Sequence, residues 1–201
     1  MALDDVKVEH IVAFGDALFA FSITFMAISL TMPEIQNNAN EREIIEALAS
    51  LWPKILQYII SFVVVSFYWV GFHRTFNYIK HTNSVIIWLT LLFLLFITFV
   101  SFATGLVVED ANSSIVMVIY SLILSSTGFI SFGIWYYSSR NQEIVDNNIQ
   151  PSIVRHYHIR SLVPSLVFLA TIPVAFIDPR HTPYTWLVMF PITSIMRRKY
   201  A

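Results

Sequence analysis

One carboxylate lies within a hydrophobic stretch and is the side chain of this sequence most able to do chemistry. The stretch from residue 9 to residue 34 carries no charge between Ala17 and Pro33, and Asp16 lies inside its start. A carboxylate at the centre of a membrane helix costs about 2.5 to 3.5 kcal/mol, so Asp16 should face protein or water rather than lipid. Such a group either relays protons or bonds a neighbouring helix.

A tryptophan and a histidine are suitable partners for that carboxylate. Trp69 and His73 are one helical turn apart in SFVVVSFYWVGFHRTF, so indole and imidazole share a helix face. Their predicted depth in the membrane is that of His10 and Asp16. Because a buried carboxylate needs hydrogen-bond donors, we expect the ring N–H groups of Trp69 and His73 to provide them.

The remaining titratable residues do not form an enzyme or metal site. The chain has no cysteine and only five glycines, so thiolate chemistry and a glycine-rich phosphate loop are excluded. The histidines form no HExxH motif and are not paired at matching depth in two helices, as a haem would require. We therefore expect no catalytic residues, no metal, no cofactor and no nucleic-acid partner. The six histidines are His10, His73, His81, His156, His158 and His181.

Composition places these residues in an integral membrane protein. Of the 201 residues, 56% are hydrophobic and 12% are charged, which is typical of an all-α membrane domain. We predict one domain over residues 1–201 with six membrane helices, the first being the stretch around Asp16. Pro164 and Pro173 should bend the fifth helix, and Pro191 should break the sixth. The other predicted spans are 52–72, 84–107, 114–137, 161–177 and 184–196, and a short amphipathic turn is expected at 41–48.

The distribution of charge predicts the orientation. Nine of the twelve basic residues fall on one side of the predicted spans, and by the positive-inside rule that side is cytoplasmic, with both termini. The nine are Lys7, Arg74, Lys80, Arg140, Arg155, Arg160, Arg197, Arg198 and Lys199. An acidic outer surface that could concentrate cations is formed by Glu34, Glu41, Glu43, Glu46, Glu109, Asp110 and Asp178.

A stripe of small and aliphatic residues follows Asp16 along the first helix. Its members recur at intervals of three and four, which places them on one helix face. The stripe is acidic at both ends and apolar between them. Its members are Asp16, Ala20, Ile23, Ala27, Leu30 and Glu34.

Two motifs of this sequence resemble those of a known family. The HIVAFGD segment from His10 to Asp16 is similar to the RxxxFSD signature of the lysosomal potassium channel family, transmembrane protein 175. The second-helix segment with Trp69 and His73 resembles the second signature of that family. Two residues depart from the pattern, since His10 replaces an arginine and Gly15 replaces a serine. Arg74 could compensate for the arginine that is missing at position 10.

The resemblance implies a potassium-preferring cation channel without a TVGYG filter. It implies a homotetramer in which four first helices surround a central pore, narrowed by rings of Ile23, Ala27 and Leu30 acting as a hydrophobic gate. The same resemblance implies a structural network of His10, Phe14, Asp16, Trp69 and His73. A prokaryotic member of the family would be a multi-pass protein of the bacterial plasma membrane, in contact with lipid and with permeant K⁺ and other monovalent cations.

Two other functions remain open from the residues alone. A proton-coupled transporter would use Asp16 with His10 or His73 as a relay, but the two halves of the chain lack the similarity that inverted repeats would give. A non-conducting membrane scaffold or a redox protein is the third possibility.

Overall fold

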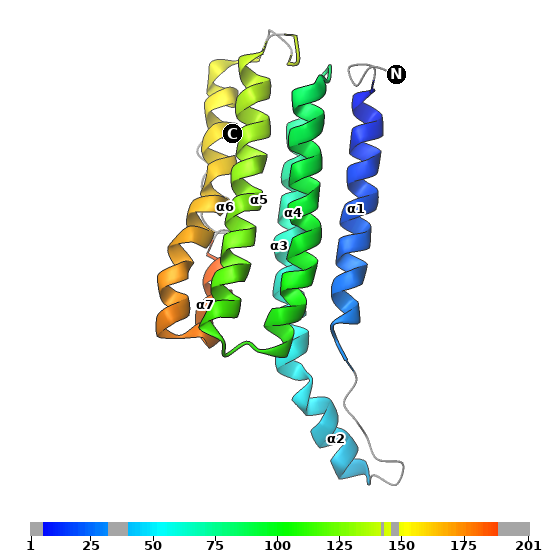
Figure 1. Cartoon of the computed structure of the whole chain (residues 1–201), viewed down its shortest axis with the longest axis vertical. Coiled ribbons are helices and arrows are strands. Elements are labelled where there is room, and N and C mark those ends of the chain that lie inside the picture. Colours follow the sequence, from blue (N-terminus) through cyan, green and yellow to red (C-terminus); the bar gives the residue numbers. More distant parts are fainter. Residues whose placement is uncertain (1–5, 32–39, 142, 146–148, 189–201) are drawn as a thin grey trace.

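The computed structural model describes residues 6–31, 40–141, 143–145 and 149–188. Within these ranges the chain is helical, and five helices are long and apolar enough to cross a membrane (Figure 1). They are α1 (Val8–Ile28), α3 (Trp52–Phe76), α4 (Ser84–Glu109), α5 (Ser114–Arg140) and α6 (Pro151–Ile177).

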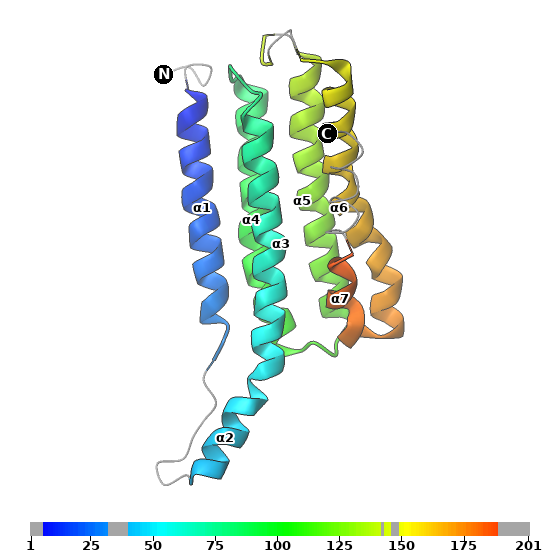
Figure 2. The same ribbon diagram turned by 180° about the vertical axis from the view of Figure 1, so that it is seen from behind.

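The long helices run side by side as an elongated bundle. Figures 1 and 2 show α1 at one edge, α3 and α4 in the middle, and α5 followed by α6 at the opposite edge. The most extensive packing joins α5 to α6 and α4 to α5, while α1 packs on α4 and α3. Because it lies at the edge, α1 leaves much of its surface outside the core of the chain.

Five of the six predicted spans overlap the five long helices of the structure. The fifth helix is the main correction, since α6 begins at Pro151 and not at residue 161. Proline suits the first turn of a helix because its missing N–H would have no partner there, and the following basic turns extend α6 beyond its apolar segment. The predicted sixth span at 184–196 begins in α7 (Thr182–Trp186), and its larger part lies outside the described residues.

Two tyrosine hydroxyl groups in the bundle core are paired across helices. Tyr68 on α3 donates to the carbonyl oxygen of Leu124 on α5 at 2.6 Å. Tyr120 on α5 donates to Ser61 Oγ on α3 at 2.9 Å. Both tyrosines are buried, and a buried hydroxyl without a partner would cost about 1 to 3 kcal/mol, so these bonds fix α3 against α5.

The short helix α7 is held in the core by Trp186. The indole ring is fully buried and stacks on Tyr120, with ring centroids 4.7 Å apart. Its Nε1 donates to Thr171 Oγ1 on α6 at 3.4 Å. Trp186 therefore connects α7 to both α5 and α6.

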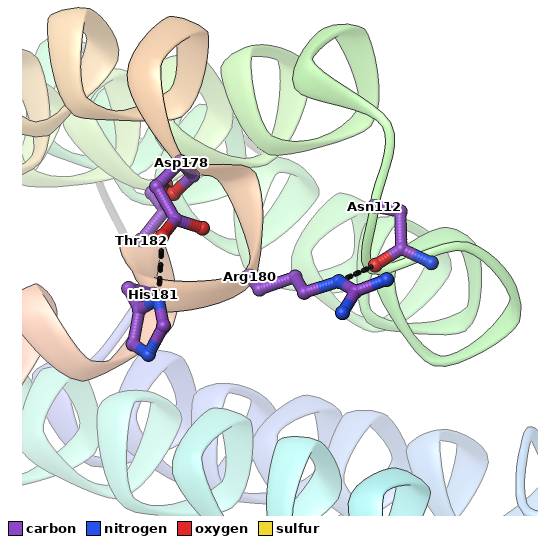
Figure 3. A network of polar contacts seen from close by, with 5 residues as sticks. All are labelled: Asn112, Asp178, Arg180, His181 and Thr182. Atoms are coloured by element: carbon purple, nitrogen blue, oxygen red, sulfur yellow. Dashed lines mark hydrogen bonds and ion pairs between the residues drawn. The ribbon is translucent and has the colours of Figure 1, made fainter.

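A polar network closes the end of the bundle between α4 and α7. Arg180, in the 3₁₀ turn η2 (Pro179–His181), donates through Nε to Asn112 Oδ1 in the turn between α4 and α5 (Figure 3). His181 Nδ1 lies 2.7 Å from Asp178 Oδ2, and this hydrogen bond lowers the pKa of the Asp178 carboxyl. A lowered carboxyl pKa supports the folded turn at neutral pH, and that support is lost as the pH falls through the lowered pKa.

The predicted amphipathic turn is a complete helix, α2 (Glu41–Ser50). Asn40 and Glu43 form a reciprocal capping box, in which each side chain accepts from the backbone N–H of the other residue. The helix has no buried residue and projects beyond the bundle at the start of α3 (Figures 1 and 2).

Replacing Trp186 with alanine should detach α7 from the bundle. Removing a fully buried indole costs about 3 to 5 kcal/mol in a well-packed core. We expect the Trp186→Ala variant to melt well below the wild type in detergent, as measured by fluorescence during heating. The control is Trp52→Ala, because Trp52 is 63% exposed and its removal should change the melting temperature little. Equal losses in both variants would contradict this role of Trp186.

Candidate functional site

The packing of α1 divides its surface into a buried and a bare face. One turn of an α-helix takes 3.6 residues, so residues three and four apart share a face. The buried residues Ile11, Gly15, Phe19, Ser22 and Met26 follow this spacing and face α3 and α4. The opposite face is exposed in the single chain. Its exposed residues include Ala13, Ala17, Ala20, Thr24, Ala27 and Ile28.

Small residues bring α1 close to α3 at one point. A Cβ atom added to Gly15 would lie 2.7 Å from Cζ of Phe72, which is shorter than any ordinary carbon contact. The Phe72 ring therefore occupies the space of a side chain at position 15. This contact explains why position 15 holds a glycine, because a serine there would require Phe72 to move.

The contact between α1 and α4 uses the same kind of residue. Ser101 Oγ donates to the carbonyl oxygen of Ser22 at 2.9 Å. A Cβ atom on Gly105 would come within 3.0 Å of Ser29 Oγ. Small residues spaced by four allow such close approach between membrane helices.

Asp16 joins α1 to α3 through two hydrogen bonds. Trp69 Nε1 donates to Asp16 Oδ1 at 2.8 Å, and His73 Nε2 lies 2.7 Å from the same oxygen. An ionised carboxylate only accepts, so the imidazole donates in this contact. The two rings pack edge to face with centroids 4.6 Å apart. The Asp16 side chain keeps 44% of its surface exposed, so part of the carboxyl group remains open to the bare face of α1.

The other residues expected in this network lie elsewhere. His10 is exposed in the first turn of α1 and is not among the residues that bond Asp16. Phe14 is 50% exposed. Arg74 does not compensate for the missing arginine, because one residue of helix turns the side chain by about 100° and directs it toward α6, away from Asp16.

The residues expected to narrow a pore differ in how exposed they are. Ala27 is exposed on the bare face, whereas Ile23 is partly covered and packs against the core. Ile23 lines an open hollow of about 300 Å³ between α1 and α3, together with Asp16, Ala20 and Trp69.

Leu30 departs from the predicted helical stripe. The helix α1 ends at Ile28, and the backbone N–H of Leu30 bonds the carbonyl oxygen of Ala27 in a final tighter turn. Helical spacing therefore does not place Leu30 relative to Ile23. Glu34, at the end of the predicted stripe, lies outside the described residues.

Sequence reasoning missed the contacts that seat α1 on its neighbours. Phe72 was one of many phenylalanines, and nothing in the sequence marked it as the residue opposite Gly15. Ser101 and Gly105 carried a weak signal, since two small residues four apart indicate a helix contact, but the spacing does not name the partner helix.

Comparison with known proteins gives consistent matches. The model of the family described as "Endosomal/lysosomal potassium channel TMEM175" matches residues 10–100, which run from the first turn of α1 through α2 and α3 into α4. The chain is 26% identical to "Potassium channel B446_29190" of Streptomyces collinus over 170 residues, which are 83% of this chain and 81% of that protein.

A more distant vertebrate relative and one solved structure extend these matches. The chain is 25% identical to "Endosomal/lysosomal proton channel TMEM175" of Gallus gallus over 85% of its own length, and it spans about a third of that protein (35%). The fold is similar to that of the lysosomal potassium-selective channel TMEM175 homolog from Chamaesiphon minutus, with a TM-score of 0.79 and 20% identity. That alignment covers 96% of this chain and 97% of the other.

Removing the Asp16 carboxylate should weaken the attachment of α1 to α3. In the Asp16→Ala variant two ring N–H groups lose their acceptor, at a cost of about 1 to 3 kcal/mol for each donor left buried. We expect a lower melting temperature and less assembled protein on size-exclusion chromatography. The Asp16→Asn variant should lose less, because the amide oxygen can still accept. If Asp16→Ala assembles and melts like the wild type but has lost ion flux, the carboxylate acts in conduction and not in structure.

Proposed function

The chain belongs to the TMEM175 family of potassium channels, and we propose that it conducts K⁺ through a pore that four copies of α1 surround. It is a multi-pass membrane protein with five candidate membrane spans in its described residues. The bacterial relative from Streptomyces collinus is named a potassium channel.

The observation that carries the proposal is the bare face of α1. This helix packs on α3 and α4 along one side only, at the edge of the bundle, and its other side is exposed. Ala20 and Ala27 on that side are small and Thr24 keeps its hydroxyl bonded to the carbonyl oxygen of Ala20 at 2.9 Å. A central pore gives this face a function, because four copies would each turn it toward a common axis.

An apolar lining can select cations without a filter of carbonyl oxygens. A narrow apolar neck makes an ion shed part of its water without replacing the lost ligands, and it can also close by dewetting. Potassium gives up its hydration shell more readily than sodium, so a preference for K⁺ follows, of modest size. We assign the neck to Ile23, Ala27 and Leu30, with Ile23 as its narrowest ring because Ala27 is small and Leu30 lies beyond the helix.

The acidic end of the bundle supports cation entry in this arrangement. Glu41, Glu43 and Glu46 lie on α2, and Glu109 and Asp110 lie at the end of α4. A negative mouth raises the local concentration of cations, and salt screens the effect. The basic residues Lys7, Lys80 and Arg140 flank helix ends at the opposite side, which we place in the cytoplasm by the positive-inside rule.

Proton conduction is the second candidate function, and one contact favours it. Asp16 and His73 are 2.7 Å apart beside the hollow that Ile23 lines, so a proton could pass between carboxylate and imidazole near the pore. The relative from Gallus gallus is named a proton channel.

Flux measurements in liposomes separate these functions. Purified protein is reconstituted with a K⁺ gradient, a Na⁺ gradient or a proton gradient alone, and the flux is followed with an indicator dye. Flux that is greater for K⁺ than for Na⁺ supports the potassium channel. Flux with the proton gradient alone would favour the second candidate, and no flux from a stable assembly would contradict both.

Cysteine scanning can locate the pore face, because the wild-type chain contains no cysteine. Each single variant then offers one reactive thiol per subunit. We expect a water-soluble thiol reagent to block K⁺ flux through Ile23→Cys and Ala27→Cys. Flux through Ile115→Cys should be unaffected, since Ile115 lies in the first turn of α5. Block through Thr24→Cys and Ile28→Cys without block through Ile23→Cys would place a different stripe of α1 on the axis.

Replacing Ile23 with asparagine should widen or wet the neck. A ring of polar amides returns hydrogen bonds to the ion and resists dewetting, so we expect a severalfold higher K⁺ flux and a smaller ratio of K⁺ to Na⁺ flux. The matched control is Ile115→Asn, which places the same side chain away from α1. Unchanged flux and unchanged selectivity in a correctly assembled Ile23→Asn channel would remove Ile23 from the constriction.

A further inference from the structure

A second polar site lies on the far side of α3 from the Asp16 cluster. It is a small, partly open pocket between α3, α5 and α6, with a cavity volume of about 40 Å³. On this measure about 10 to 15 Å³ holds one water molecule, so the pocket has room for a small polar group such as one phosphate, with the rest of a larger molecule outside it. Gly71 on α3 keeps it open, because a Cβ atom added there would meet nothing within 4 Å.

Two guanidinium groups line this pocket from different helices. Arg74 reaches it from the last turns of α3, and Arg160 reaches it from α6. No aspartate or glutamate is among the described residues that line it. The Nη1 atom of Arg74 is shielded from solvent and has no hydrogen-bond partner within the described ranges of the chain. A buried guanidinium N–H without an acceptor is costly, so the site favours an anion.

The chemistry of these groups suits a phosphate. Guanidinium groups present planar forks of donors that match two oxygens of a phosphate, and two of them can hold one phosphate from two sides. Tyr157 and Ser131 also line the pocket.

The walls and the depth of the pocket indicate a lipid. Phe67, Val70 and Pro164 form an apolar wall, and Val70 is 36% exposed on the outside of the bundle. Arg74 lies at the same end of the bundle as Lys7, Lys80 and Arg140, where the phosphate groups of the inner leaflet would lie. Basic pockets between membrane helices on the cytoplasmic side are typical sites for anionic headgroups.

We propose that this pocket binds the phosphate group of an anionic phospholipid, such as phosphatidylglycerol, between Arg74 and Arg160. The acyl chains extend along the apolar wall of Phe67 and Val70 toward the lipid-exposed side of α3. The bound headgroup neutralises the two guanidinium groups and bridges α3 to α6. This site is distant from the bare face of α1 and does not depend on which stripe of α1 lines the pore.

Native mass spectrometry of the purified, assembled protein tests the site. The protein is titrated with phosphatidylglycerol and, separately, with phosphatidylcholine of the same acyl chains. We expect the wild type to retain phosphatidylglycerol more strongly. The double variant Arg74→Gln and Arg160→Gln should bind phosphatidylglycerol about tenfold or more weakly, because it loses charge-assisted hydrogen bonds from both sides. Equal retention of both lipids by the wild type would overturn the proposal.

Two controls separate this pocket from general attraction to a basic surface. Lys80→Gln with Arg155→Gln removes the same charge from exposed residues at the same end, and it should leave the lipid preference unchanged. Gly71→Leu keeps both arginines but fills the pocket, so it should lose the lipid. Gly133→Leu is its match, since Gly133 also has open space around its Cβ position and does not line the pocket. Loss of preference in either control would overturn the assignment to this pocket.

Inorganic phosphate distinguishes a lipid from a free anion. Added alone at millimolar concentration, it should neither bind tightly nor displace phosphatidylglycerol, because it cannot use the apolar wall. Displacement of the lipid by inorganic phosphate at low concentration would overturn the lipid assignment and leave a site for free phosphate. Size-exclusion elution and melting temperature are measured for every variant, and only variants that assemble like the wild type are compared.

Discussion

The structure depends on one constraint, that a polar group inside a membrane costs free energy unless it bonds a partner within the protein. Asp16 meets this constraint through α3, where Trp69 and His73 supply both donors to one carboxylate oxygen. The tyrosines of the core meet it by bonding across helices, as Tyr68 does with Leu124. Each such pair fixes two helices in register, because a shift of either helix would leave a donor without an acceptor.

The packing of α1 against α3 and α4 follows from this constraint and leaves the opposite side of the helix exposed. Its polar attachments include the bonds of Asp16 to α3 and the bond of the Ser22 carbonyl to Ser101 on α4, and its buried side also relies on close packing by Gly15, Phe19 and Met26. A helix held along one side is stable in a single chain, yet it presents an apolar surface that a membrane protein can use in an assembly. Because neighbouring helices cover α1 on one side only, residues that follow Asp16 by helical spacing differ in exposure. Ile23 is partly covered, whereas Ala27 is exposed.

Much of this architecture could be predicted from the sequence, and the errors have physical causes. Hydropathy located the five long helices, and the one-turn spacing of Trp69 and His73 correctly paired them with Asp16. The start of α6 was missed because its first turns are polar although helical. Arg74 was misjudged because its neighbour His73 faces Asp16, whereas a residue one step further points to another helix. Periodicity identifies a face of a helix but does not name what packs against it.

The contact between Gly15 and Phe72 links two positions that are far apart in the chain. The ring of Phe72 fills the volume that any side chain at position 15 would need, so a larger residue at position 15 requires the Phe72 ring to move or a smaller residue to replace it. A family member with serine at the first position must have a smaller or differently turned residue at the second. The two positions should therefore covary during evolution, and the family signature at the start of α1 is one half of a pair whose other half lies near the end of α3.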